Sequence, residues 1–321
     1  MKSIGGYLEL ELNEGVEYHQ GALRLNTGRN AFEYILRAKK YKKVYIPYYT
    51  CDVILQPINR LGIEYEYYSI NEAFEPIFNY TKIHKSEAFL YTNYFGLKDR
   101  FVSDFSKKCR NPIIDNSQAF FSRPIAGVDT FYSPRKFFGL PDGAYLYTNK
   151  FLKERLEQDC SYNRCEHLLR RIDKGPEDAY KIFVKKDQFL SGLSVKAMSS
   201  LTQKLLESID YVDVAEKRRS NFKLLHERLG KRNKLKIEFK KDIVPLSYPY
   251  YPGENNLREQ LIKNRIYTAQ YWPNVIRLSN PNRLEHAYAL NIVHLPISQM
   301  CVSADMKRIV NLIYRFDTHY E

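Results

Sequence analysis

The sequence predicts an α/β protein with a mixed, mostly parallel sheet sandwiched by helices and a smaller C-terminal α+β domain. Short apolar runs alternate with helical runs of roughly ten residues through the first half of the chain. A long helical stretch follows, and short strand-like runs return beyond it. Polar residues stand where several apolar runs end, and parallel sheets collect their ligands at such strand ends. We therefore expect a large domain over residues 1–230 and a small domain over residues 231–321.

The first half of the chain supplies the strands of the expected sheet. Strands are expected at 7–12, 44–47, 63–70, 88–93, 112–115 and 145–148, and helices at 31–40, 52–61 and 98–109. This alternation favours right-handed βαβ units and a largely parallel sheet that is covered on both faces. Residues 7–12 alternate polar and apolar side chains, so we expect a half-exposed strand near an edge.

The second half of the chain is mostly helical before the strands return. Helices are expected at 151–160 and through most of 178–229, with a break near Asp210. Further strands are expected at 237–239, 242–246 and 294–295, and further helices at 256–263, 284–290 and 302–314. No apolar run reaches the roughly 18 residues that a membrane span needs, so no membrane partner is expected.

Composition narrows the function classes. The chain has 321 residues and a formal net charge of +13. Its basic residues occur as short pairs with no long basic arm, so no nucleic-acid partner is expected. The five cysteines lack C-x-x-C spacing and the histidines lack metal-ligand spacing, which disfavours a disulfide framework and a metal site. The start of the chain has no signal-peptide pattern, and we expect a cytoplasmic protein.

A glycine-containing turn precedes the first expected helix. Residues 25–30 read Leu-Asn-Thr-Gly-Arg-Asn and lead into a run with helical spacing. The first N–H groups of a helix have no partner within it, so a turn of this kind can hold a phosphate. Gly28 could also be an ordinary turn glycine.

The segment 113–148 contains an acid and an amine that could act together. Asp115 ends an apolar run, and Lys136 lies between a short β-like run and a Gly/Pro turn. A carboxylate and an amine at neighbouring strand ends are the minimum needed to hold pyridoxal phosphate, with lysine as the Schiff-base partner and aspartate on the pyridine nitrogen. Taken alone, Lys136 could be a solvated surface lysine and Asp115 a helix N-cap.

Six short motifs occur in an order that resembles the DegT/DnrJ-type sugar aminotransferase family. They are N-T-G-R-N-A-F at 26–32, V-Y-I-P-Y-Y-T at 44–50, N-Y-F-G at 93–96, D-N-S-Q-A at 115–119, S-P-R-K at 133–136 and D-G-A at 142–144. E-K-R-R at 216–219 and L-P-I-S-Q at 295–299 also fall where the family has comparable segments. The resemblance runs through most of the chain and implies the fold-type-I architecture of pyridoxal-phosphate enzymes.

The resemblance also implies roles for individual residues. Lys136 would form the internal aldimine and shuttle the proton, and Asp115 would pair with the pyridine nitrogen. Gln118 would reach the phenolic oxygen of the cofactor ring. The cofactor phosphate would be held by Gly28, Arg29, Asn30 and Ser133. Arg29 could instead point toward an anion of the substrate.

Three departures from the family pattern bear on the site. Cys51 stands where the family commonly stacks an aromatic ring on the cofactor, and Tyr48 or Tyr49 could substitute for it. The run that approaches Lys136 is shorter than usual and lacks a histidine. D-G-A replaces E-G-G, and no N-Y-R segment occurs at 189–198, where a partner subunit would usually contribute contacts.

The resemblance implies transfer of an amino group, usually from glutamate, to a keto group of a nucleotide-linked sugar. It also implies a homodimer and a place in polysaccharide biosynthesis. Two alternatives stay open. The same scaffold could run another pyridoxal-phosphate reaction, such as sugar dehydration or a reaction of an amino-acid substrate. The chain could also be a catalytically degenerate relative that binds a ligand, which the altered stacking position would favour.

Overall fold

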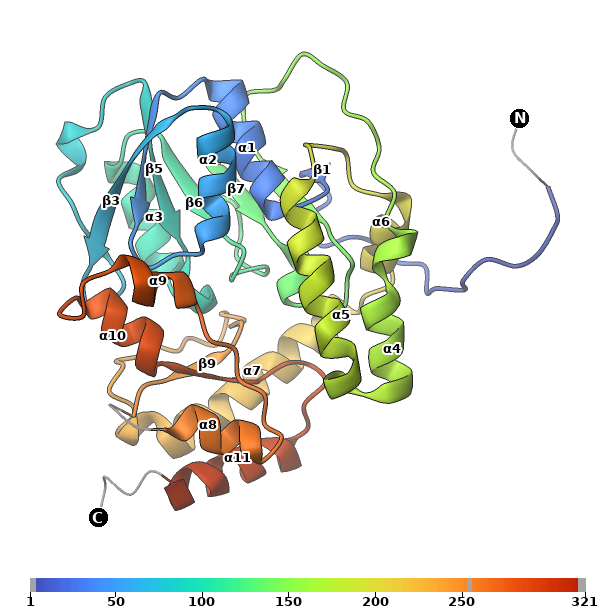
Figure 1. Ribbon diagram of the computed structural model, residues 1–321, viewed down its shortest axis with the longest axis vertical. Helices are drawn as coiled ribbons and strands as arrows, with labels where there is room; N and C mark the ends of the chain where they lie inside the picture. The colour runs from blue at the N-terminus through green and yellow to red at the C-terminus, as the bar shows by residue number, and fades with distance from the viewer. Residues whose placement is uncertain (1–3, 253–255, 317–321) are drawn as a thin grey trace.

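A computed structural model describes residues 4–252 and 256–316. Its centre is an eight-stranded mixed sheet with the order β1-β8-β7-β6-β5-β2-β3-β4. The strands from β7 to β3 are parallel to their neighbours, whereas β8, β1 and β4 pair antiparallel. A separate two-stranded sheet pairs β9 with β10. Figure 1 shows the large sheet with α1, α2 and α3 in the upper part of the picture, and the C-terminal elements below.

The elements have the following bounds. The strands are β1 Leu23–Leu25, β2 Lys43–Pro47, β3 Glu64–Ile70, β4 Pro76–Ile77, β5 Glu87–Thr92, β6 Pro112–Asp115, β7 Asp129–Tyr132, β8 Ala144–Tyr147, β9 Tyr248–Tyr250 and β10 Val293–Leu295. The α-helices are α1 Gly28–Lys39, α2 Leu55–Arg60, α3 Asp99–Lys108, α4 Glu166–Lys174, α5 Pro176–Phe189, α6 Ser200–Glu207, α7 Tyr211–Leu229, α8 Leu257–Lys263, α9 Pro273–Leu278, α10 Leu284–Asn291 and α11 Ser303–Phe316. Short 3-10 turns are η1 Asp52–Ile54, η2 Tyr80–Lys82, η3 Tyr94–Gly96, η4 Pro134–Lys136, η5 Tyr162–Arg164, η6 Leu190–Gly192 and η7 Gly230–Arg232.

The local sequence explains where helix α1 begins and which side of it is buried. The hydroxyl of Thr27 accepts the N–H of Asn30 at 3.2 Å and so caps the helix. Phe32, Ile35 and Leu36 are fully or almost fully buried along one side, against the sheet. The cap and this buried face together fix where the first N–H groups of α1 point.

Two apolar clusters cover the two faces of the sheet. In β2, Val44 and Ile46 belong to the cluster with α1 and α2, whereas Tyr45 between them belongs to the cluster with α3. The second cluster is rich in aromatic rings; Tyr68 and Phe89 stack there with ring centroids 4.4 Å apart. Many of the tyrosines in this sequence are therefore core residues of that face.

A third cluster joins the end of α7 to the C-terminal elements. Phe222, Leu225 and Leu229 of α7 pack with residues of β9, β10, α8 and α11. Helix α7 therefore contributes its last turns to the core of the C-terminal part. We propose that the domain boundary expected at residue 230 falls at the end of this shared helix.

Most of the expected elements of the large sheet are present within one or two residues, and α1 begins three residues before its expected start. The strands expected at 44–47, 63–70, 88–93, 112–115 and 145–148 and the helices at 31–40, 52–61 and 98–109 correspond to β2, β3, β5, β6, β8, α1, η1 with α2, and α3. The break near Asp210 is also confirmed, because the Asp210 carboxylate caps α7 by accepting the N–H groups of Val212 and Asp213. The mixed, mostly parallel sheet is therefore as expected.

Three expectations are wrong. Residues 7–12 form no strand: no strand pairing includes them in the described residues, Glu9 forms an ion pair with Lys204, and Tyr7 and Leu8 are 98% and 86% exposed. Residues 151–160 form no helix, because the Asp159 N–H donates to the Ala197 carbonyl at 2.9 Å and Gln158 bridges the same residue. Long-range pairing has overridden the helical spacing there. The segments 237–239 and 242–246 are irregular, since β9 takes the place beside β10.

Candidate active site

The N-terminus of α1 faces two serines that follow neighbouring strands. A Cβ atom added to Gly28 would lie 3.5 Å from Ser133 Cβ and 3.6 Å from Ser117 Oγ. Within the described parts of the chain, the N–H groups of Gly28 and Arg29 have no hydrogen-bond partner. Two unpaired N–H groups and two hydroxyls around one small space suit a phosphate group. We call this arrangement the α1 cradle.

Asp115 ends β6 at the carboxyl edge of the sheet. In the pairing of β6 with β7 it lies opposite Phe131, two residues before Ser133. The carboxylate is buried, and its Oδ1 atom accepts the N–H of Ser117 at 2.8 Å. Burial raises the pKa of Asp115, while the hydrogen bonds of Ser117 and the charge of Lys136 lower it. The acid and the lysine are thus close enough to affect one another electrostatically.

Lys136 follows β7 through the short turn η4. Its backbone N–H donates to the carbonyl of Ser133 at 3.1 Å, and the Phe137 N–H donates to that of Pro134 at 2.9 Å. The turn therefore links the lysine directly to a serine of the α1 cradle. Asp115 follows β6 and Lys136 follows the adjacent strand β7, so both lie with the α1 cradle at the same end of these two strands.

The amine of Lys136 lies in a crowded and charged environment. The residue is exposed at the surface, but the protein packed around its amine lowers the pKa of that amine by desolvation. The charge of Arg135 lowers this pKa further, whereas Cys51, Asp187 and Asp115 oppose the shift. A lysine with a lowered pKa is neutral, and so nucleophilic, over a wider pH range than a surface lysine.

Gln118 is held by the motif N-Y-F-G. Its Oε1 atom accepts the N–H of Phe95 at 3.0 Å. Gly96 has φ +72°, and a Cβ atom there would lie 3.0 Å from the carbonyl oxygen of Gln118, so the close approach requires glycine. Because Oε1 is occupied, the amide NH₂ is the group of Gln118 that can donate to a ligand.

Arg29 and Asn30 have side-chain partners away from the cradle. The guanidinium of Arg29 donates from Nη1 to Gln56 Oε1 at 2.7 Å and to Ser191 Oγ at 2.8 Å. The amide of Asn30 donates to Asn26 Oδ1 and to the carbonyl of Ser194, each at 2.8 Å. Arg29 can therefore offer the cradle its backbone N–H, whereas both donors of Asn30 are used within the protein.

The three residues considered for stacking lie in different surroundings. Tyr49 is fully buried and packs on Tyr94 and Trp272, with ring centroids 5.7 and 4.8 Å away. Tyr48 stacks on Tyr67 at 4.8 Å. Cys51 is the one that interacts with the lysine: burial raises the pKa of the thiol, and the charge of Lys136 lowers it.

A buried ionic network supports the turn before α1. Asp142 accepts from Arg164 Nη1 and from Thr202 Oγ1, and burial raises its pKa to about 6. Arg164 also binds Asp159, with Nη2 2.6 Å from Oδ1. The next residue, Gly143, donates its N–H to the carbonyl of Asn26 at 2.6 Å. The D-G-A motif therefore fixes the backbone that leads into the α1 cradle.

Replacing Arg164 with leucine is expected to lower the free energy of unfolding by about 3 kcal/mol, because two buried carboxylates lose their common cation. The loss should shrink as pH falls from about 8 to 5. Without the cation the folded protein binds protons more readily than the unfolded chain, so its stability rises as pH falls. Urea denaturation at both pH values measures the effect.

The exposed Arg170, whose side chain is 45% accessible and pairs with Asp178 and Glu166, provides the control. Arg170→Leu should leave the free energy of unfolding nearly unchanged at either pH, because a solvent-exposed ion pair contributes little. Equal losses for both variants would contradict the structural role of Arg164.

Sequence reasoning missed two polar residues at this site. Ser117 stands two positions after Asp115, and its small hydroxyl within D-N-S-Q-A was the available signal. Asp187 on α5 forms an ion pair with Arg135 at 2.7 Å. No local pattern connects Asp187 with Arg135, because the two residues lie 52 positions apart.

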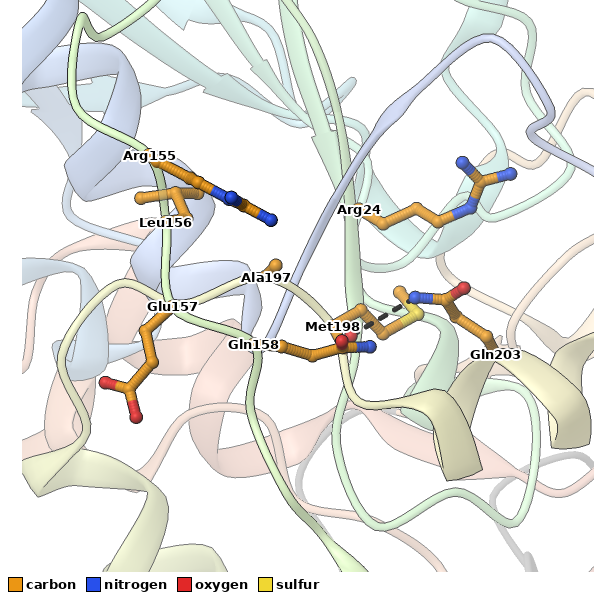
Figure 2. Close-up of a pocket in the computed structure, with 8 residues that line it drawn as sticks. All are labelled: Arg24, Arg155, Leu156, Glu157, Gln158, Ala197, Met198 and Gln203. Carbon is orange, nitrogen blue, oxygen red and sulfur yellow. Dashed lines mark hydrogen bonds between the residues drawn. The ribbon is translucent and has the colours of Figure 1, made fainter. Parts of the chain in front are cut away.

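A hollow of about 590 Å³ lies elsewhere on the molecule. Figure 2 shows its lining side chains, including Arg24, Arg155 and Met198, with the Gln203 amide donating to the Met198 carbonyl. None of the expected site residues lines it, so we assign the candidate site to Lys136, Asp115 and the α1 cradle. Within the described residues no cluster of side chains could hold a metal ion, and no helix has the length and apolarity to cross a bilayer.

No model of a known protein family matches this sequence, and no curated protein sequence matches it. Solved structures do match. An aminotransferase of the DegT DnrJ EryC1 StrS type from Brucella abortus is 16% identical, with a TM-score of 0.62 over 92% of this chain and 86% of the other. The chain has the fold of these aminotransferases. This result confirms the expected fold-type-I architecture.

Two further structures share this fold. The putative sugar aminotransferase Spr1654 from Streptococcus pneumoniae in its apo-form is 15% identical, with a TM-score of 0.66 over 93% of this chain and 86% of the other. Structures of its PLP-form and PMP-form also match. A GDP-4-keto-6-deoxy-D-mannose-3-dehydratase from E coli, with bound hydrated PLP, is 12% identical, with a TM-score of 0.60 over 91% and 87% of the two chains.

Proposed function

We propose that this chain is a pyridoxal-phosphate-dependent aminotransferase that acts on a keto group of a nucleotide-linked sugar. One observation carries the proposal: Asp115 and Lys136 follow the adjacent strands β6 and β7, and the N-terminus of α1 faces Ser117 and Ser133 at the same strand ends. The fold shared with structures of sugar aminotransferases supports it.

The residues present fit pyridoxal phosphate. The α1 cradle offers the N–H groups of Gly28 and Arg29 and the hydroxyls of Ser117 and Ser133 to a phosphate. Asp115 offers a carboxylate to the ring nitrogen. When bound, the cofactor supplies an electron sink that stabilises negative charge at the carbon from which a proton is removed.

The protein residues then have distinct tasks. Lys136, with its lowered pKa, would be the residue that bonds to the cofactor, and its Nζ would carry the proton between the substrate carbon that bears the amino group and a carbon of the cofactor. Asp115 holds a proton on the ring nitrogen by its charge, and Gln118 donates its amide NH₂ to the ring oxygen. Cys51 stands at the position where the family commonly has an aromatic ring that stacks on the cofactor.

The charge around the site favours an anionic substrate. The charge of Arg135 acts on Lys136, and Arg135 forms an ion pair with Asp187. Arg29 lies near Arg135, and the charges of Asp187 and Asp52 act on it. The guanidinium groups of Arg29 and Arg135 supply positive charge that favours a pyrophosphate. We propose a nucleotide sugar as acceptor, glutamate as donor, a cytoplasmic location and a homodimer.

The test is cofactor binding followed by a half-reaction. The purified protein is expected to bind pyridoxal phosphate and to gain a visible absorbance, which borohydride should fix to a peptide containing Lys136. Adding glutamate should then convert the bound cofactor to pyridoxamine phosphate. A protein that takes up no cofactor would refute the proposal. Binding without a response to glutamate would favour a dehydratase or a ligand-binding relative.

A further inference from the structure

The carbonyl oxygen of Phe137, directly after Lys136, accepts two hydrogen bonds from distant segments. Arg218 on α7 donates to it from Nη2 at 3.2 Å, and Gln299 after β10 donates from Nε2 at 2.9 Å. The two donors are also bound to one another, because Arg218 Nε donates to Gln299 Oε1 at 3.0 Å. The three groups form a closed ring of hydrogen bonds behind the lysine.

Arg218 is a buried cation that has no carboxylate partner in the described part of the chain. It is 2% exposed, and burial lowers its pKa to about 10. Its Nη1 atom donates to the carbonyls of Pro245 and Leu246 at 3.3 and 3.1 Å, and the guanidinium lies 4.6 Å from the centre of the Phe137 ring. Backbone carbonyls and an aromatic face thus replace the water that the cation has lost.

Burying a cation in this way costs free energy, so an apolar side chain would be the simpler choice for packing alone. The fork of a guanidinium lets one side chain bind carbonyls from two separate segments, which a lysine cannot do with the same geometry. The arrangement therefore fits a residue that fixes backbone positions.

We propose that Arg218 and Gln299 are positioning residues that hold the peptide after Lys136 and so aim the lysine amine at the site. The proposal rests on the role proposed for Lys136. Turn η4 is only three residues long, and its internal bonds fix the backbone before the lysine. The Phe137 carbonyl fixes the backbone after it, so loss of both donors frees one side of the turn.

The proposal also connects the site to the C-terminal part of the chain. Gln299 belongs to the L-P-I-S-Q segment after β10, and Arg218 lies in the helix that closes against β9 and β10. The orientation of Lys136 therefore depends on the docking of the C-terminal elements against the large sheet.

The test measures Lys136 in the protein without cofactor. Limiting acetic anhydride labels lysines according to their neutral fraction, and peptide mass spectrometry compares Lys136 with the exposed Lys153 across a pH series. In the unchanged protein, Lys136 should be labelled with a midpoint below that of Lys153. In Arg218→Met and Gln299→Leu, this midpoint should rise by about one pH unit, because the freed amine leaves the crowded position beside Arg135.

Two comparisons separate positioning from stability. Lys217→Met changes an exposed residue one position away and should leave the Lys136 midpoint unchanged. The double variant should shift the midpoint no further than Arg218→Met, because the two donors share one acceptor. Should Arg218→Met fail to fold, Gln299→Leu and Arg218→Lys carry the test.

An unchanged Lys136 profile in folded Gln299→Leu and Arg218→Lys would overturn the proposal, even if both variants melt at lower temperature. The measurement needs no bound cofactor, so a failure of the positioning role can be distinguished from a failure of the proposed function. A protein that binds no pyridoxal phosphate but shows the shift would refute the function and keep the positioning role.

Discussion

A Lys136→Ala variant is expected to lose amino transfer by at least about 10⁴-fold, because the amine is both the bonding partner of the cofactor and the group that moves the proton. The rate is measured as conversion of bound pyridoxal phosphate by glutamate in a single turnover. The variant should still fold, since Lys136 keeps contact with solvent and its removal opens no apolar cavity.

An amine added to the solution can replace the missing amine of Lys136. A small amine such as ethylamine should restore part of the rate in Lys136→Ala, because it can occupy the vacated position and accept the proton. Lys153→Ala, a change of an exposed lysine 17 positions later, should leave the rate within a factor of about two. A rate in Lys136→Ala within tenfold of the unchanged protein would contradict the assigned role.

Local patterns predicted the parallel part of the fold because those elements satisfy their own periodicity. Phe32, Ile35 and Leu36 recur at helical spacing and are buried on one side of α1. The strands β2, β5 and β6 are short apolar runs that are buried on both faces, as parallel strands must be when helices cover them. In these cases the tertiary environment agrees with the local preference.

The errors occur where a distant partner decides the structure. Leu152 and Leu156 have the spacing of a helix, but they pack against the α1 side of the sheet while the chain pairs with Ala197. Residues 7–12 have the alternation of a strand but no neighbouring strand in the described chain. A single sequence contains no signal for either outcome, because pairing depends on a segment about forty residues away or on none at all.

In the candidate site too, local motifs predicted some residues, whereas others are placed there only by distant contacts. Asp115, Gln118, Gly28 and Ser133 could be proposed because each stands in a short motif at the end of a strand or the start of a helix. Arg218 could not be assigned a role beside Lys136, because its contacts with the Phe137 carbonyl span 81 positions and arise only when α7 docks. Motifs therefore indicate the groups that contact a ligand, and the fold is needed to identify the groups that hold them.

Replacing Asp115 with asparagine is expected to slow amino transfer by about 10²-fold to 10³-fold while the protein still folds and binds pyridoxal phosphate. Asparagine has the same shape, and its Oδ1 atom can still accept the N–H of Ser117 that Asp115 accepts at 2.8 Å. What it lacks is the charge that would hold a proton on the ring nitrogen. Asp104→Asn on the exposed side of α3 is the control and should keep the full rate.

In Asp115→Asn, the labelling midpoint of Lys136 is expected to shift in the direction opposite to that expected for Arg218→Met. The charge of Asp115 raises the pKa of Lys136, so its removal should move the labelling midpoint of Lys136 downward in the protein without cofactor. An upward shift would mean that asparagine had displaced the lysine, and the slower rate would then reflect geometry. A downward shift with a slower rate would assign the loss to the missing carboxylate charge, because electrostatics and position move the Lys136 pKa in opposite directions.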